Sequence, residues 1–233
     1  MSLYRSLILV TSLCALTALA GCAKDPSKDA PAAKVSEPAP EEKPAEPTPP
    51  PAAPAAAPSP TAAPAAQPVA LTGSIGFIGS KVTGSHNGEF KDFKGSIALK
   101  DGKPEGGQLE FTVQTASLVT LDANPMKEKL EGHLKSPDFF DVAKFPTATF
   151  TSTEINVGGP NGATHTIKGK LTLRGVTKDV EFPATLALAG KDISGKTEFS
   201  INRKDFGIVF AGMPNDLIRD GVVIKIDVKA TLP

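Results

Sequence analysis

Few residues in this sequence have the type and spacing that metal binding would require. The histidines are His86, His133 and His165, each isolated among predicted turn or helix residues. Zinc and haem sites draw on clustered ligands such as His-Glu-x-x-His, Cys-x-x-Cys or Cys-x-x-Cys-His, and none of these patterns occurs. The sequence therefore predicts no metal site and no cofactor.

Asp138 and Asp141 come nearest to a catalytic pair, because two neighbouring carboxylates can divide acid and base roles. The favoured interpretation is structural, since negative charge stabilises the start of a helical turn. The sequence also lacks a Gly-x-Ser-x-Gly elbow and a glycine-rich phosphate loop. We therefore expect no enzymatic activity, and a hydrolase or oxidoreductase is the least favoured class.

One cysteine, Cys22, lies in a motif for covalent lipid attachment. Leu19-Ala20-Gly21-Cys22 follows a basic residue and an apolar run, as in the lipobox of bacterial lipoproteins, whose cysteine receives a diacylglyceryl group. We expect residues 1–21 to be a signal peptide and Cys22 to be the lipidation site. The alternative is ordinary signal cleavage that leaves a free cysteine. Lipidation predicts a protein anchored in the bacterial envelope, and Ala23 favours the outer membrane, facing the periplasm.

Composition divides the rest of the chain in two. Fourteen of the 22 prolines lie between Pro26 and Pro68 in a stretch with almost no large apolar residue, which cannot offset the entropy of ordering. We therefore expect residues 22–68 to be a lipidated, disordered Pro/Ala-rich tether and residues 69–233 to form one domain. The 25 basic and 25 acidic residues balance, which gives no argument for a nucleic-acid partner.

Alternating apolar and polar residues in this domain predict about eight antiparallel strands, and so a sandwich or a closed barrel. The strands fall near residues 74–82, 90–99, 109–113, 148–157, 167–173, 180–188, 193–201 and 222–232. Ser85–Gly88 contains Asn-Gly and predicts a turn. A short helical insert is expected around residues 124–141, starting at Asn124-Pro125. In a closed barrel the last strand must pair with the first.

Phenylalanine is the enriched aromatic residue. The chain has 12 phenylalanines, no tryptophan and a single tyrosine, Tyr4, which lies in the predicted signal peptide. A lining without hydrogen-bonding aromatics suits an isoprenoid or acyl chain better than a sugar or a base. The alternative is that the phenylalanines fill an ordinary core.

Several blocks of the domain, in order along the chain, resemble YceI-like domains. They are Gly84-Ser85-His86 with Gly88 and Phe90, Phe93-Lys94-Gly95, the stretch from Leu130 to Pro146 with Ser136 and Asp138-Phe139-Phe140-Asp141, Gly169 to Lys178, and Ile201 to Ile208. The resemblance implies an eight-stranded antiparallel barrel of lipocalin-like shape that binds a polyisoprenoid or similar long lipid. Arg174 departs from the pattern, since many members carry histidine there.

The resemblance and the alternation together give a set of candidate site residues. The expected apolar lining is Phe111, Val113, Phe139, Phe140, Phe150, Leu171, Leu173, Phe182, Phe199 and Phe206, and the expected polar mouth is His86, His133 and Arg203. The leading hypothesis is a membrane-anchored periplasmic protein that sequesters or carries a long-chain lipid. The alternative is a non-enzymatic envelope-stress or interaction module whose barrel is filled by its own side chains.

Overall fold

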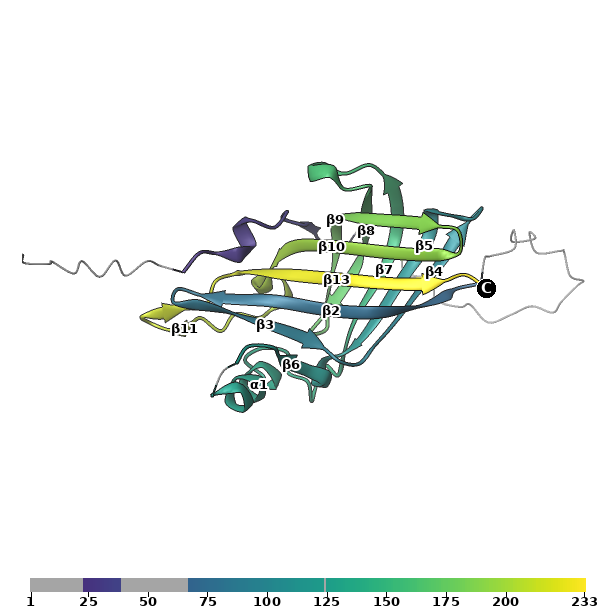
Figure 1. The fold of residues 1–233 in the computed structure, drawn as a ribbon. Coiled ribbons are helices and arrows are strands. Elements are labelled where there is room, and N and C mark those ends of the chain that lie inside the picture. The colour runs from purple at the N-terminus through teal and green to yellow at the C-terminus, as the bar shows by residue number, and fades with distance from the viewer. Residues whose placement is uncertain (1–22, 39–66, 124) are drawn as a thin grey trace, which may run out of the picture.

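The computed structural model describes residues 23–38, 67–123 and 125–233. Their main body is a closed antiparallel β-barrel (Figure 1). Its wall strands, in chain order, are β2 (Val69–Lys81), β4 (Phe93–Lys100), β5 (Lys103–Gln114), β7 (Thr147–Val157), β8 (His165–Leu173), β9 (Val176–Ala189), β10 (Asp192–Asn202) and β13 (Gly221–Thr231). β13 pairs with β2, so the last strand closes the barrel on the first wall strand. The predicted eight-stranded antiparallel barrel is confirmed.

One predicted turn is wrong. Ser85–Gly88 lies inside a further strand, β3 (Gly84–Phe90), which pairs with β2 from Ile75 to Lys81 and with the short β6 (Leu118–Thr120). The hairpin turn comes earlier, at Val82-Thr83. Asn87 and Gly88 keep extended backbone because the β2 ladder runs through them. β3 and β6 therefore extend the wall beside β2 without entering the closed circle of strands.

The predicted helical insert is present but shorter than expected. Helix α1 spans Lys127–Lys135, with Met126 at its N-cap, and turns continue through Phe140. The expected start at Asn124-Pro125 is wrong for Pro125, which precedes the helix, while Asn124 lies outside the described residues. Leu134 packs against the barrel core, whereas Met126 is exposed. In the described part of the chain, no helix is long and apolar enough to cross a membrane.

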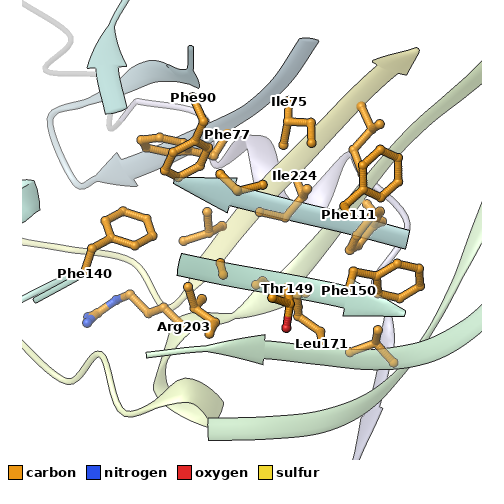
Figure 2. Close-up of a pocket in the computed structure, with 18 of the residues that line it drawn as sticks. Ile75, Phe77, Phe90, Phe111, Phe140, Thr149, Phe150, Leu171, Arg203 and Ile224 are labelled. Carbon is orange, nitrogen blue, oxygen red and sulfur yellow. The ribbon is translucent and has the colours of Figure 1, made fainter. Parts of the chain in front are cut away.

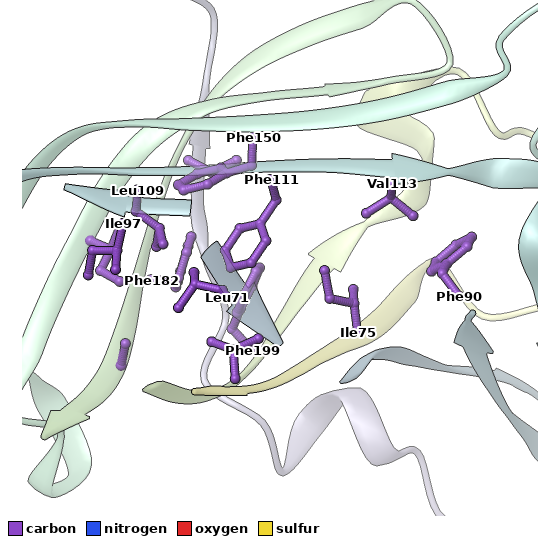
Figure 3. Packing of buried hydrophobic residues seen from close by; sticks show 14 of the residues in the cluster. Leu71, Ile75, Phe90, Ile97, Leu109, Phe111, Val113, Phe150, Phe182 and Phe199 are labelled. Atoms are coloured by element: carbon purple, nitrogen blue, oxygen red, sulfur yellow. The ribbon is translucent and has the colours of Figure 1, made fainter. Parts of the chain in front are cut away.

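The barrel interior is filled at the end where the chain terminates. Aliphatic side chains from facing strands pack there, and Ile97, Ile167 and Ile193 are each only 2% exposed (Figure 3). A layer of phenylalanines bounds this packed half, with the rings of Phe182 and Phe199 stacked 4.1 Å apart. Burial of this surface is the main force holding the barrel closed. The larger interior space lies on the other side of the phenylalanine layer, and only about 30 Å³ remains among the aliphatic side chains.

Residues 23–38, which we call the N-terminal arm, fill a seam in the barrel wall. β9 and β10 pair only through residues 185–189 and 192–196 and diverge beyond them. In the gap, β1 (Lys34–Ser36) pairs with residues 179–181 of β9, and Ala32 bridges Ser200 of β10. The arm also includes a 3₁₀ turn, η1 (Pro26–Lys28), which contacts β13.

The ordered arm differs from the predicted tether. Low hydrophobicity argues against a separate core, but strand pairing uses the backbone N–H and C=O groups that nearly every residue carries. Ala33 N–H donates to Ser200 O, and Ser200 N–H donates to Pro31 O, both at 2.8 Å. Val35 adds apolar contact with the barrel core. The predicted signal peptide, Cys22 and residues 39–66 lie outside the described residues.

Replacing Val35 with aspartate should release the arm from the seam. A half-buried side chain would become a charged one facing apolar surface, at a cost of about 1–2 kcal/mol. The melting temperature should then fall by several degrees, measurable by circular dichroism. Ser36→Asp, at the exposed neighbouring position, is the matched control and should leave the melting temperature unchanged. An unchanged value for both variants would contradict docking of the arm.

The first turn of the arm should release in acid. Partial burial raises the pKa of Asp25, but hydrogen bonds from Ser27 and the charge of Arg219 outweigh it and leave the pKa below its ordinary value of 3.8. A carboxylate with a lowered pKa stabilises the folded state above its ordinary pKa, and this stabilisation is lost as pH falls through the lowered value. The Ser27 amide signal should therefore shift below about pH 4 in NMR titrations. Asp25→Asn should abolish that step, and a step that persists in the variant would refute its assignment to Asp25.

Candidate functional site

An apolar cavity of about 160 Å³ occupies the less densely packed half of the barrel (Figure 2). Phe111 and Phe150, direct neighbours on β5 and β7, form part of its wall, with Ile224 on β13 and Leu171 on β8. Ile224 and Leu171 point inward yet are only half-buried, because their free surface faces the cavity. The barrel is thus filled at one end and hollow at the other.

Three phenylalanine rings pack together on one side of the cavity. Phe140 lies 5.6 Å from Phe90, edge to face, and 6.0 Å from Phe77, while Phe77 and Phe90 lie 5.7 Å apart. Phe140 belongs to the turn after α1, where Phe140 N–H donates to Leu134 O and Asp141 N–H to Ser136 O. This compact turn lets the adjacent Phe139 and Phe140 both line the cavity, which extended chain would not allow.

Two glycines make room for the wall phenylalanines. A Cβ on Gly95 would lie 2.7 Å from the ring of Phe111, its cross-strand partner, and a Cβ on Gly169 would lie 2.6 Å from the ring of Phe150. Both distances are too short for carbon atoms that are not bonded to each other. Each ring therefore packs over a glycine of the neighbouring strand, and this contact sets how far the ring reaches into the cavity.

Arg203 is a charged residue on an otherwise almost wholly apolar lining, and it is only 3% exposed. Its stem lines the cavity while its guanidinium donates to Arg219 O at 3.0 Å, Ile208 O at 2.7 Å and Ile218 O at 3.2 Å. It also donates to Asp220 Oδ1 at 3.3 Å. Burial lowers the pKa of Arg203, and Asp220 opposes that shift. The guanidinium is therefore committed to the protein's own acceptors.

The same end of the barrel is held together by contacts between loops. Arg174, which has a left-handed backbone (φ 53°), donates to Gly207 O and to Pro137 O, both at 2.6 Å. His133 pairs with Asp138 at 3.0 Å, and its ring packs 4.9 Å from Phe210. These contacts tie the loop after β10 to the segment after α1.

The structure brings most of the predicted lining residues together. The cavity wall includes Phe111, Val113, Phe139, Phe140, Phe150, Leu171, Leu173, Phe182 and Phe199. Phe206 does not line the cavity. It is fully buried in the core, in the 3₁₀ turn η4 (Arg203–Phe206), which begins where Asn202 caps the end of β10 and breaks the strand alternation.

The three residues predicted for a polar mouth are dispersed. Arg203 lines the cavity, but His86 and His133 do not. His86 is bound to Asp122 and His133 to Asp138, both at 3.0 Å. Lining residues that the prediction missed include Ile75, Phe77, Phe90, Ile224 and Ile226. Strand alternation on β2 and β13 carried the signal for most of them.

Among the residues that the structure describes, the cavity wall holds few polar side chains. Thr149 and Arg203 are the polar lining residues. Within residues 23–38, 67–123 and 125–233, no group of three or more His, Cys, Asp or Glu side chains is placed to hold a metal ion. The cavity can therefore offer a ligand apolar contact and little hydrogen bonding.

Comparison with known families decides the assignment. The model of the YceI-like domain matches residues 69–230, which is the whole barrel. The chain belongs to the YceI-like domain family. Among curated relatives of this YceI-like domain, a UPF0312 protein from Pseudomonas fluorescens is 40% identical over 129 residues, and one from Pseudomonas putida is 38% identical over 128. These matches cover 52% of this chain and 63% of each relative, less than two thirds of the relatives' length.

Solved structures show the same fold for this YceI-like domain. Burkholderia cenocepacia BcnA superposes with a TM-score of 0.57 at 24% identity, covering 68% of this chain and 96% of BcnA. A polyisoprenoid-binding domain from Saccharophagus degradans, implicated in plant cell wall breakdown, superposes with a TM-score of 0.51 at 15% identity. That match covers 69% of this chain and 94% of the domain. At these identities the likeness establishes the fold alone.

Proposed function

We propose that this YceI-like domain binds the hydrocarbon chain of a long-chain lipid, an isoprenoid or similar, in the hollow half of its barrel. The observation that carries the proposal is the lining: phenylalanine and branched aliphatic side chains surround the cavity, and its single guanidinium is bound by backbone carbonyls. A hydrocarbon chain binds favourably in such a site because binding removes it from water, whereas a sugar, a base or an anion would find few hydrogen-bond partners there. The polyisoprenoid-binding neighbour from Saccharophagus degradans supports the ligand class.

The cavity volume limits how the chain is held. About 160 Å³ is close to the ~150 Å³ of an apolar cavity that accommodates benzene, and an isoprene unit has one carbon fewer than benzene. One unit therefore fits the cavity as it stands. A longer chain has to displace Phe77, Phe90 or Phe140 from the aromatic side of the cavity, or leave its remainder outside the barrel.

The cellular setting of the proposal comes from the sequence. The lipobox at Leu19–Cys22 supports a lipid anchor at Cys22 in the bacterial envelope, and Ala23 supports the periplasmic side of the outer membrane. In that setting the protein sequesters or carries a lipid that has left the bilayer.

A chain-length series tests the proposal. The full chain, stripped of lipid, is loaded with a fluorescent polyene fatty acid and titrated with geraniol, farnesol and longer polyprenols. Affinity should rise over the first isoprene units, because each buried carbon contributes roughly 0.8 kcal/mol, and then level off. A soluble sugar should not displace the probe. If neither the probe nor any polyprenol binds, the alternative of an interaction module without a ligand is favoured instead.

A further inference from the structure

The hollow end of the barrel and the first residue of the arm lie at the same end of the molecule. Ala23 N–H donates to Val82 O at 3.2 Å, in the turn between β2 and β3, and Arg219 donates to Ala23 O. Arg219 also pairs with Asp25 at 3.5 Å. Figure 1 shows the start of the arm at the end of the barrel opposite the C-terminus. Cys22, the predicted lipidation site, directly precedes Ala23 in the sequence.

A small hairpin projects beside Ala23. It consists of β11 (Gly212–Met213) and β12 (Asp216–Leu217). Val82, whose carbonyl accepts from Ala23, donates its own N–H to Leu217 O at 3.1 Å. Val82 therefore binds both the hairpin, through Leu217, and the start of the arm, through Ala23.

Exposed apolar side chains gather on this hairpin and the loop leading to it. Met213 is 69% exposed, Val209 66% and Leu217 48%, three of the seven large apolar residues that are exposed in the described ranges. Because Met213 pairs with Asp216 and Leu217 with Gly212, Met213 and Leu217 lie on opposite faces of the hairpin. Insertion of the hairpin into an apolar medium would bury both side chains.

The loop also reaches the cavity. Arg203 and Ile208 line it, and the Arg203 guanidinium binds the carbonyls of Ile208 and Ile218, one at each side of the hairpin. The hairpin and the hollow half of the barrel therefore belong to one connected end.

We propose that this end faces a lipid bilayer, with the hairpin inserted into the membrane surface and the barrel held against it by acylated Cys22. The docked arm leaves no free tether between the anchor and the barrel, so the domain lies on the membrane with its hollow half toward the lipid. A hydrocarbon chain then passes between bilayer and cavity without crossing open water. This last step rests on the proposed lipid binding, whereas the orientation rests on the proposed acylation of Cys22 and not on a ligand in the cavity.

Depth-dependent quenching tests the orientation. Met213→Cys and Lys191→Cys are each labelled with an environment-sensitive fluorophore in the mature, lipidated chain. Of the two natural cysteines, Cys14 would leave with the predicted signal peptide and Cys22 would be acylated. Lys191 lies at the far end, where its Nζ donates to Pro233 O at 3.0 Å. The protein is reconstituted in phosphatidylethanolamine and phosphatidylglycerol vesicles that carry nitroxide-labelled acyl chains. Fluorescence at position 213 should be quenched severalfold more than at position 191.

Arg219→Ala, which removes the contacts to Ala23 and Asp25, should bring quenching at position 213 down toward that at position 191. Equal quenching at positions 213 and 191 in the chain that keeps Arg219 would overturn the proposal. Strong quenching at position 213 that persists in Arg219→Ala would also overturn it. A chain that fails to float with the vesicles would overturn it by removing the anchor. Because the readout needs no ligand in the cavity, failure of lipid binding in the polyprenol titration would leave the orientation result standing.

Discussion

Ala148→Phe is expected to abolish lipid binding while leaving the barrel folded. Ala148 faces inward from β7, opposite Val113, and lines the cavity. A phenyl ring attached there has about the size of the space available, since an apolar cavity of ~150 Å³ holds benzene. The ring would occupy the volume that an isoprene unit needs, and the loss of about five buried carbons corresponds to roughly 4 kcal/mol, or about a thousandfold in affinity.

Stability separates this effect from misfolding. Because the new ring enters existing space, the free energy of unfolding should change by no more than about 1 kcal/mol, far less than overpacking of a filled core costs. Thr151→Phe adds the same ring on the exposed face of the same strand and should bind lipid normally. Titration with the fluorescent fatty acid and urea denaturation measure the two quantities. If Ala148→Phe binds as tightly as the unaltered chain, the cavity is not the binding site.

Arg203→Met should destabilise the domain more than other single changes at the hollow end. The variant keeps an apolar stem against the cavity but leaves the carbonyls of Ile208, Ile218 and Arg219 without their donor. Each unsatisfied buried acceptor costs about 1–3 kcal/mol, and some relief by water brings the expected total to roughly 3–5 kcal/mol. The melting temperature should fall by about 10 °C or more.

Arg203→Lys is the informative partner variant. Lysine keeps the charge but lacks the planar fork that reaches several acceptors at once, so we expect an intermediate loss. Differential scanning calorimetry of both variants measures the order. A melting temperature for Arg203→Met within about 2 °C of the unaltered chain would show that the carbonyls find other donors, and that Arg203 does not hold the loop.

The barrel was predictable because alternation survives in most wall strands. Val222, Ile224 and Ile226 on β13 define an inward face by themselves, and the need to pair β13 with the first strand followed from closure. The failures occur where a local signal competes with tertiary pairing. Asn87-Gly88 is a strong turn signal taken alone, yet the ladder of β2 holds it in β3.

The N-terminal arm was not predictable from its composition. Its apolar contribution is small, with Val35 the main contact, and its order comes from backbone hydrogen bonds to exposed edges of β9 and β10. Those edges exist only because the two strands diverge beyond Lys196, a feature of barrel geometry that period-two patterns do not encode. Phe206 was misplaced for a related reason, since the 3₁₀ turn at Arg203 ends the alternation.

The cavity itself was beyond the reach of sequence reasoning. The strand pattern alone predicts that Phe111 and Phe150 point inward. Whether the space between such rings is filled depends on small residues in the neighbouring strands, such as Gly95 and Gly169. It also depends on where the turn after α1 places Phe140. The alternation of apolar and polar residues predicts which side chains point into the barrel, whereas the volume of the cavity depends on how those side chains pack. The lining was therefore largely predicted, whereas the choice between a hollow and a filled barrel was left open.

Native mass spectrometry of the full chain, purified from bacterial envelopes and then loaded with polyprenol, tests the central claim most directly. Gentle ionisation should preserve a non-covalent lipid that collisional activation releases, whereas an acyl anchor on Cys22 would stay covalently attached. We predict one lipid per chain for the unaltered protein and for Thr151→Phe, and none for Ala148→Phe. A chain that carries no releasable lipid after loading, or an Ala148→Phe variant that carries as much as the unaltered chain, would contradict lipid binding in the barrel cavity.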